Sequence, residues 1–334
     1  MTATRRQNRA NGSGSTQISA RKPTTMSTDP LLPKPTGPGL LSYDESLRLL
    51  PWQTDNAFVL SGYRQQLHSV RACLFSAFAY LHNETVNIHT HSIGALFFLI
   101  LLPLHLIPTH FPAFSYILPT PPWREDNPLP VPPTWQDKAA FTVYLLSAVG
   151  CLGLSCCFHT VQCHSHRVCD TAHRGDYIGI IVLIVGSIMP GMYLSFHGHP
   201  HLQAFYSTAI LVAGITSAYI VLSPHHRSHI WHRTLTFIAL GLSTIIPVVH
   251  VLLTQGLAYA RERTSLDLVI ATGVAYISGA LLYAARLPEK LSPGTFDYFG
   301  SSHQIFHVMV LVGAWCQYAA LRGMVWGRSM AVGG

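Results

Sequence analysis

The stretch His303-Gln304-Ile305-Phe306-His307 begins the last long apolar run of the chain. On a helix, its two imidazoles lie one turn apart and on the same face. This is a spacing that suits metal ligands, and it falls at the start of a segment long enough to cross a membrane. Ionisable side chains at the ends of membrane spans are candidates for function. The question that decides the fold is therefore whether polar residues at the ends of other predicted membrane spans lie close to these two histidines.

The composition is that of a membrane protein. The 334 residues are 49% hydrophobic and only 10% charged, whereas soluble domains have roughly 25% charged residues. Seven apolar stretches are each about 20 residues long, enough to cross about 30 Å of hydrocarbon as a helix. They begin near His89, Ala139, Asp176, Leu202, Arg233, Asp267 and His303. We therefore expect an all-α integral membrane protein, a bundle of seven transmembrane helices.

The distribution of Lys and Arg predicts the orientation of the bundle. Nine of these residues lie in the N-terminal part through Arg71, six more fall on the same side, and six fall on the other side. The positive-inside rule then predicts a cytoplasmic N-terminus and an outside or luminal C-terminus. We expect a disordered cytoplasmic tail over residues 1–60, a membrane domain over 61–326 and a short outer tail over 327–334. Apolar residues at helical spacing over 63–80 predict an interfacial helix before the first span.

The positive charge does not indicate a nucleic-acid-binding protein. The formal net charge is +7 and the pI is near 9.1, but the basic residues are scattered beside the membrane segments. They form no basic patch interleaved with aromatic residues. Most of the seven cysteines fall in or just after a span on the predicted cytoplasmic side, where disulfides are rare, so we interpret them as thiols.

The predicted topology brings four polar residues to one depth of the membrane. The second span runs from outside to the cytoplasm and ends at His159, the third starts there with Asp176, and the seventh starts there with His303 and His307. Three neutral imidazoles plus a water form the open tetrahedral site typical of catalytic zinc. Asp176 would hold the water and accept its proton. Ser155 lies one turn before His159 and would point into the same cavity.

A simpler interpretation is available for each of these residues alone, which is that a polar side chain merely sits at the membrane interface. The shared depth of the four residues favours the metal site, and the imidazole ligands favour zinc over copper only by ligand type. Glu84, Asn87 and His91 follow one helical face before the first span. We interpret them as a polar face that ties this helix to its neighbours rather than as ligands.

Several longer motifs carry a resemblance to a known family. They are Gly62-Tyr63-Arg64, the run from His82 to Ile88 with Thr90-His91, Ser155 to His159, Gly175 to Ile180, Gly241-Leu242-Ser243, Tyr283 to Glu289, and Ser302 to His307. From about residue 63 to 318 the chain resembles the progestin and adipoQ receptor family, which includes adiponectin receptors, fungal osmotin-receptor-like proteins and haemolysin III relatives.

The resemblance implies a seven-helix fold with a cytoplasmic N-terminus and a zinc ion near the cytoplasmic face. The residues that match the zinc ligands are His159, His303 and His307, and Asp176 matches the acid that holds the water. A hydrolytic activity on ceramide accompanies this site in adiponectin receptors. Residues that match Tyr177 and Arg233 lie there near the carboxylate of a fatty acid. Fungal relatives are linked to zinc and lipid homeostasis.

We therefore expect a zinc-dependent intramembrane amide hydrolase of the ceramidase type, in the plasma membrane or the endoplasmic reticulum. Its partners would be membrane lipids, with ceramide as substrate or a free fatty acid as product, and Arg233 would pair with the fatty-acid carboxylate. The alternative is a receptor or sensor with a structural zinc, for which the sequence names no extracellular protein ligand. A zinc transporter fits less well, because the predicted ligands cluster on one side of the membrane.

Overall fold

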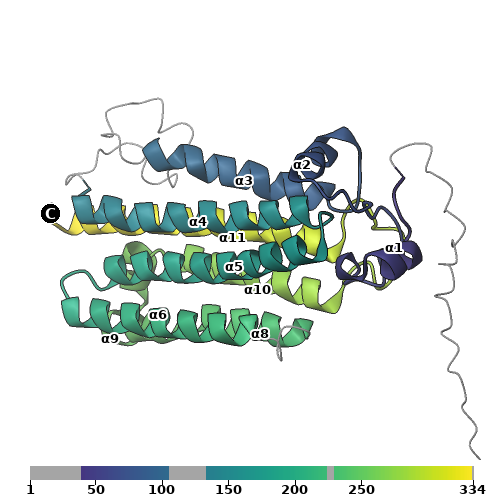
Figure 1. Ribbon diagram of the computed structural model, residues 1–334. Helices are drawn as coiled ribbons and strands as arrows, with labels where there is room; N and C mark the ends of the chain where they lie inside the picture. Colours follow the sequence, from purple (N-terminus) through teal and green to yellow (C-terminus); the bar gives the residue numbers. More distant parts are fainter. Residues whose placement is uncertain (1–38, 105–132, 224–228, 333–334) are drawn as a thin grey trace, which may run out of the picture. The chain divides into compact units, whose positions relative to one another are not determined.

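The computed structural model describes residues 39–104, 133–223 and 229–332, and every regular element in these ranges is helical. The helices that are long and apolar enough to span a membrane make seven spans, so the chain is a multi-pass integral membrane protein. They are α3 (Thr85–Leu104), α4 (Trp135–Val161), α5 (His166–Ser195), α6 (Pro200–Leu222), α8 (Ile230–Leu242) joined with α9 (Ile245–Arg263), α10 (Leu266–Ala285) and α11 (Ser302–Val332). In Figure 1 these helices run alongside one another. The predicted fold class is confirmed, whereas the orientation in the membrane stays a prediction.

Side-chain caps and one glycine define several helix boundaries. Thr134 begins α4 with a capping box, in which its hydroxyl accepts from the backbone N–H of Asp137 while the Asp137 carboxylate accepts from the backbone N–H of Thr134. The fifth span is not one continuous helix, because α8 and α9 meet at Ser243 and Thr244. Within α9, Gly256 has φ 84°, a left-handed conformation that interrupts the helix and that glycine adopts without steric strain.

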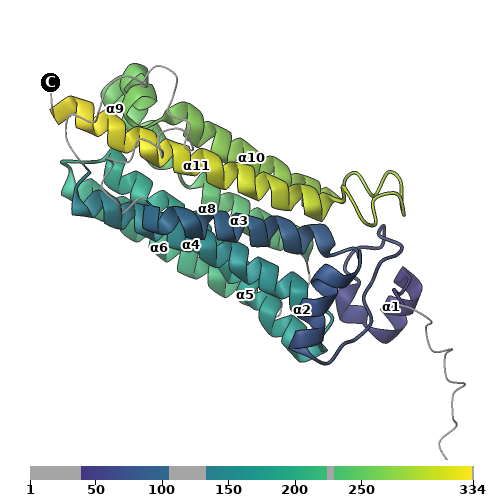
Figure 2. The same cartoon turned by 90° about the horizontal axis from the view of Figure 1, so that it is seen from above.

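The spans pack in two groups with a cavity between them. One core cluster joins α3, α4 and α11 through buried residues such as Phe98, Tyr144 and Leu321. The other joins α5 to α6, α8 and α9. Figure 2 shows α10 and α11 side by side; α10–α11 and α4–α5 are the most extensively packed helix pairs. Large apolar residues such as Phe205 and Leu253 are 64% and 83% exposed, as expected of side chains that face lipid.

The segment before the first span is more ordered than the sequence suggests. Residues 39–60, which we expected in the tail, contain α1 (Tyr43–Leu49) and a 3-10 turn, η1 (Pro51–Gln53). Leu41 forms a two-way backbone bridge with Tyr63, and the Asn56 amide donates to the carboxylate of Glu289 at 2.9 Å. These long-range bonds order a segment whose own hydropathy is low. Figure 1 shows α1 at the end of the bundle where α3 begins.

A short apolar helix lies before the first span, but it starts later than the sequence pattern predicts. It is α2 (Val70–Ala79), capped by the Ser69 hydroxyl. The residues just before it are not helical: Leu67 donates its backbone N–H to the carbonyl of Cys163, and His68 has a positive φ of 49°. Phe75 and Phe78 of α2 are 72% and 78% exposed, as an interfacial helix would require.

The last helix is longer than we expected. The sequence predicts a tail from residue 327, yet α11 continues to Val332. Arg328 near its end forms a bidentate ion pair with the buried Asp137 of α4. The Tyr193 hydroxyl of α5 lies 3.4 Å from the same carboxylate. Since the charge of Arg328 is neutralised in this cluster, the helix can continue past the point where its apolar run ends.

Candidate metal centre

Three histidines from two helices meet at the end of the bundle that lies near α1 and α2. His159 is in the last turn of α4, and His303 and His307 are in the first turns of α11. One nitrogen from each ring lies within 4.8 Å of the other two. The ring centroids form a nearly regular triangle with sides of 4.8–4.9 Å. The cluster has the ligand types and the compactness of a metal site, and these histidines could together hold a metal ion.

A buried acid fixes the start of α11 and with it two of the histidines. Glu289, fully buried, accepts from the backbone N–H of Ser302 at 2.7 Å and from its hydroxyl. Gln304 ties the same turn to the preceding loop, because its amide donates to the carbonyl of Tyr298 and accepts from the N–H of Gly300. The first N–H groups of a helix have no partner within the helix, and here the Glu289 carboxylate supplies one for Ser302.

A buried arginine holds the end of α4. Arg64 is 1% exposed, and its guanidinium donates to the carbonyls of His159 and Thr160, which are among the unpaired carbonyls of the last helical turn. It also donates to the Ser76 hydroxyl of α2 at 3.0 Å. Arg64 therefore positions the backbone from which the His159 side chain projects.

Glu84, just before α3, orients the His159 ring. Its carboxylate lies 2.7 Å from Nδ1 of His159 and accepts from the Asn87 amide at 2.7 Å. Burial raises the pKa of the Glu84 carboxyl, but the His159 imidazole and the Asn87 amide more than offset this, so the pKa lies well below its usual range. An ionised carboxylate can only accept hydrogen bonds, and this one lies 2.7 Å from Nδ1. Nδ1 of His159 must carry the proton, which leaves Nε2 as an electron-pair donor.

His307 is oriented in the same way from α3. Its Nδ1 lies 3.2 Å from the carbonyl oxygen of Asn87, which can only accept, so this ring also presents Nε2 to the cluster. His91 of α3 stacks on His307 with the ring centroids 3.6 Å apart. The polar face Glu84, Asn87 and His91 therefore ties α3 to the histidine-bearing helices, as the sequence pattern indicates.

The chemistry of this cluster fits zinc. Nε2 of His159 is buried and has no hydrogen-bond partner among the described residues, although a buried ring nitrogen normally has one. Two of the rings use Nδ1 for a protein acceptor, the arrangement in which a carboxylate or carbonyl fixes the tautomer of a zinc-binding imidazole. Three neutral imidazoles are a common catalytic zinc ligand set.

The two predicted polar residues of the reaction site lie beside the cluster, on α4 and α5. Asp176 is buried, lines the cavity that His303 also lines, and interacts with His159 electrostatically. The hydroxyl of Ser155 is hydrogen-bonded to the Asp176 carboxylate. Asp176 does not belong to the tight three-histidine group, as would be expected of an acid that acts through a water.

Tyr177 and Arg233 lie together at the same end of the cavity. The guanidinium carbon of Arg233 is 5.2 Å from the centroid of the Tyr177 ring, and the side chain of Arg233 is hydrogen-bonded to the Tyr283 hydroxyl. The hydroxyl of Tyr177 is buried without a hydrogen-bond partner among the described residues. A cation beside an unpaired hydroxyl is a suitable place for an anionic group.

The cavity has a volume of about 420 Å³ and runs between α5, the α8–α9 span, α10 and α11. Its lining on α5 extends from His173 to Ser195, nearly the whole length of the helix. The walls are largely apolar, with residues such as Ile184 and Val248. One end of this long apolar cavity therefore lies beside the histidine cluster at His303, and the shape of the cavity suits a lipid chain.

Comparison with known proteins identifies the family. The model of the family described as haemolysin-III related matches residues 79–318. The chain belongs to the haemolysin-III-related family. It is 35% identical over 281 residues to the adiponectin receptor protein of Drosophila melanogaster, a match that covers 84% of this chain but only 59% of the fly protein. Two fungal relatives match over most of their length. ADIPOR-like receptor IZH1 of Eremothecium gossypii is 35% identical, and the match covers 85% of this chain and 84% of the fungal protein. ADIPOR-like receptor IZH2 of Saccharomyces cerevisiae is also 35% identical, and the match covers 86% of this chain and 83% of the fungal protein.

These matches confirm the resemblance that the sequence motifs indicate. In this haemolysin-III-related protein the sequence motifs contain three residues whose positions around the metal centre we did not predict, namely Arg64, Glu84 and Glu289. All three are charged residues; Arg64 and Glu289 are buried, and Glu84 is half-buried, with its side chain 16% exposed. The sequence signal for these three residues is that each is a charged residue within one of the family motifs.

Proposed function

We propose that the chain is a zinc-dependent intramembrane hydrolase that cleaves the amide bond of ceramide-like lipids. His159, His303 and His307 would hold the zinc ion. The observation that carries this proposal is that one and the same cavity is lined by His303, Asp176 and Arg233 at one end and by apolar side chains along the rest. Polar side chains at one end of a long apolar cavity suit a substrate that has a polar amide group and a long hydrocarbon chain.

A zinc ion bound by the three imidazoles would supply Lewis acidity toward the amide carbonyl and toward water. Asp176 accepts the proton of the attacking water on its carboxylate and passes it to the leaving amine. Ser155 keeps that carboxylate in place through its hydrogen bond. Glu84 keeps the His159 ring in the tautomer that presents Nε2.

The same cavity end has groups suited to the fatty-acid product. Its carboxylate would lie at Arg233, whose guanidinium matches carboxylate geometry, and would accept a hydrogen bond from the unpaired hydroxyl of Tyr177. The acyl chain would extend along α5. We further propose that the metal centre faces the cytoplasm, in the plasma membrane or the endoplasmic reticulum, as the distribution of Lys and Arg predicts.

A second candidate function is that of a receptor or sensor in which the metal is structural. The names of the fly and fungal relatives, all of which contain the word receptor, favour it. The two candidates differ in turnover, because a structural site closes its fourth position with a protein ligand while a catalytic site keeps it open. The three-histidine group contains no fourth protein ligand among the described residues, which favours catalysis.

The test is the release of sphingosine and fatty acid from ceramide by the purified protein in detergent. Asp176→Asn should abolish release while the variant keeps its zinc, and His303→Ala should lose both. Asp170→Asn is the matched control, because this carboxylate lies on the same helix in an exposed pair with Arg174. Wild-type protein that contains one zinc per chain but releases no product from ceramides of several chain lengths would exclude the hydrolase and leave the receptor.

A further inference from the structure

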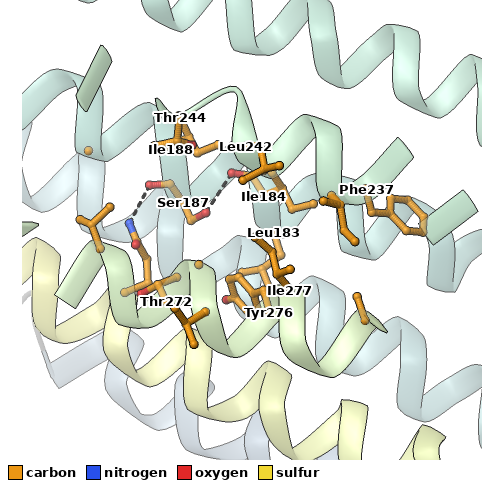
Figure 3. A pocket seen from close by; sticks show the side chains of 18 of the residues that line it. Leu183, Ile184, Ser187, Ile188, Phe237, Leu242, Thr244, Thr272, Tyr276 and Ile277 are labelled. Carbon is orange, nitrogen blue, oxygen red and sulfur yellow. Dashed lines mark hydrogen bonds between the residues drawn. The ribbon is translucent and has the colours of Figure 1, made fainter. Parts of the chain in front are cut away.

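A belt of polar side chains crosses the cavity far from the metal centre. It consists of Ser187 of α5, Thr272 and Tyr276 of α10, and Gln317 of α11, all of which line the cavity. We call these four residues the polar belt. Figure 3 shows Ser187 on one side of this part of the cavity and Thr272 and Tyr276 on the other, among apolar neighbours such as Leu183 and Ile277.

Tyr276 has a buried hydroxyl without a hydrogen-bond partner among the described residues. The ring cannot move easily to find one, because it packs over Gly313 of α11. A Cβ atom added at Gly313 would lie 2.5 Å from Cε1 of Tyr276. A phenol can donate one hydrogen bond and accept others, and leaving it unpaired in apolar surroundings is costly. The structure therefore holds an unsatisfied hydroxyl in a fixed position at the cavity wall.

Gln317 and Ser187 add further hydrogen-bonding capacity beside it. The Gln317 amide donates to the backbone carbonyl of Ser187 at 3.1 Å, and the Ser187 hydroxyl donates to the carbonyl of Ile184 at 2.9 Å. An amide has two donors and an acceptor oxygen, and a hydroxyl that donates can still accept, so these bonds leave capacity for a ligand. Polar residues this deep in a membrane protein normally serve a function.

Two residues of the polar belt, Ser187 and Thr272, lie at a similar distance along their helices from the end of the cavity near the metal centre, and Tyr276 lies one turn closer to that end. Ser187 follows Asp176 on α5, and Thr272 precedes Tyr283 on α10, each by about three helical turns, or roughly 16 Å. This separation returns a residue to nearly the same face of the helix. Asp176 and Tyr283 line one end of the cavity, so a chain that starts there and follows α5 would pass the polar belt part-way along its length.

We propose that the polar belt binds a hydroxyl group carried part-way along an acyl chain, which makes mid-chain hydroxylated lipids ligands of this cavity. The proposal rests on the proposed function, in that the carboxylate or amide end of the chain lies beside Arg233 and Asp176. The ligand hydroxyl accepts from or donates to Tyr276 and Gln317. A wholly apolar cavity would instead disfavour such a chain, because the hydroxyl would lose its bonds to water.

The test compares two fatty acids that differ only in the hydroxyl. Ricinoleic acid carries a mid-chain hydroxyl and oleic acid does not. Competition against radiolabelled oleic acid on the full chain in nanodiscs gives the ratio of the two dissociation constants. We expect ricinoleic acid to bind wild type at least as tightly as oleic acid. In Tyr276→Phe and in Gln317→Leu the ratio should shift by about ten-fold toward oleic acid.

Tyr144→Phe is the matched control, since the Tyr144 hydroxyl bonds to the carbonyl of Ala314 and lies outside the cavity lining. It should leave the ratio unchanged, and thermal unfolding of all variants checks that they fold. If wild type binds oleic acid much more tightly and Tyr276→Phe leaves the ratio unchanged, the subsite is overturned and the hydrolase proposal stands. If neither acid binds, both proposals lose their basis.

Discussion

The carboxylate of Glu84 lies 2.7 Å from Nδ1 of His159 and so joins the start of α3 to the end of α4 at the metal centre. This bond decides which nitrogen of His159 is available to a metal ion. It also makes the first span a part of the centre, although the first span contributes none of the three clustered ligands.

Replacement of Glu84 should therefore weaken metal binding without removing a ligand. We expect Glu84→Ala to lower zinc affinity by about 10- to 100-fold, the usual effect of losing the acceptor of a metal-binding imidazole. Zinc affinity is measured by competition with a chelator of known strength. Asp267→Asn, at an exposed carboxylate on α10, is the control and should bind zinc as wild type does. Equal affinities of Glu84→Ala and wild type would mean that the Glu84 bond does not act on the metal.

Loss of Arg64 should destabilise the fold as well as the centre. Arg64→Met leaves the last carbonyls of α4 without donors in a buried place, and we expect about 2–4 kcal/mol less stability, seen as a lower midpoint of thermal unfolding. Arg174→Met removes only an exposed ion pair and should cost less than about 1 kcal/mol. Similar midpoints for the two variants would contradict the role assigned to Arg64.

The ion pair between Asp137 and Arg328 predicts stability effects that are separate from the metal. Each single change, Asp137→Ala or Arg328→Ala, should cost about 3–5 kcal/mol, because it strands the other charge in a largely buried site. The double variant should cost less than the sum of the two, and zinc affinity should stay at the wild-type value in all three. Additive losses would show that the two side chains do not act as a pair.

Much of this arrangement could be predicted from the sequence. Hydropathy alone gives seven spans, and the alternation of span directions puts His159, His303 and His307 at one depth. Proximity in the plane of the membrane does not follow from depth, because it depends on which helices are neighbours. The structure supplies it by packing α11 against α4.

The supporting residues could not be predicted in the same way. Whether Glu84 meets His159 or faces lipid depends on the rotation of α3 about its own axis, which a short polar motif does not fix. Arg64 reaches α4 because the segment after Tyr63 runs alongside the end of that helix, where Leu67 donates to the carbonyl of Cys163. The apolar run at the end of α11 is a poor guide to where the helix ends, because Asp137 neutralises Arg328 there.

The most direct test of an open three-histidine zinc centre is X-ray absorption at the zinc edge on the purified full chain. The account predicts one zinc per chain with only nitrogen and oxygen neighbours at about 2.0–2.1 Å, and a loss of zinc in His159→Ala and His307→Ala. Sulfur neighbours at about 2.3 Å, or wild-type protein that binds no zinc, would contradict it.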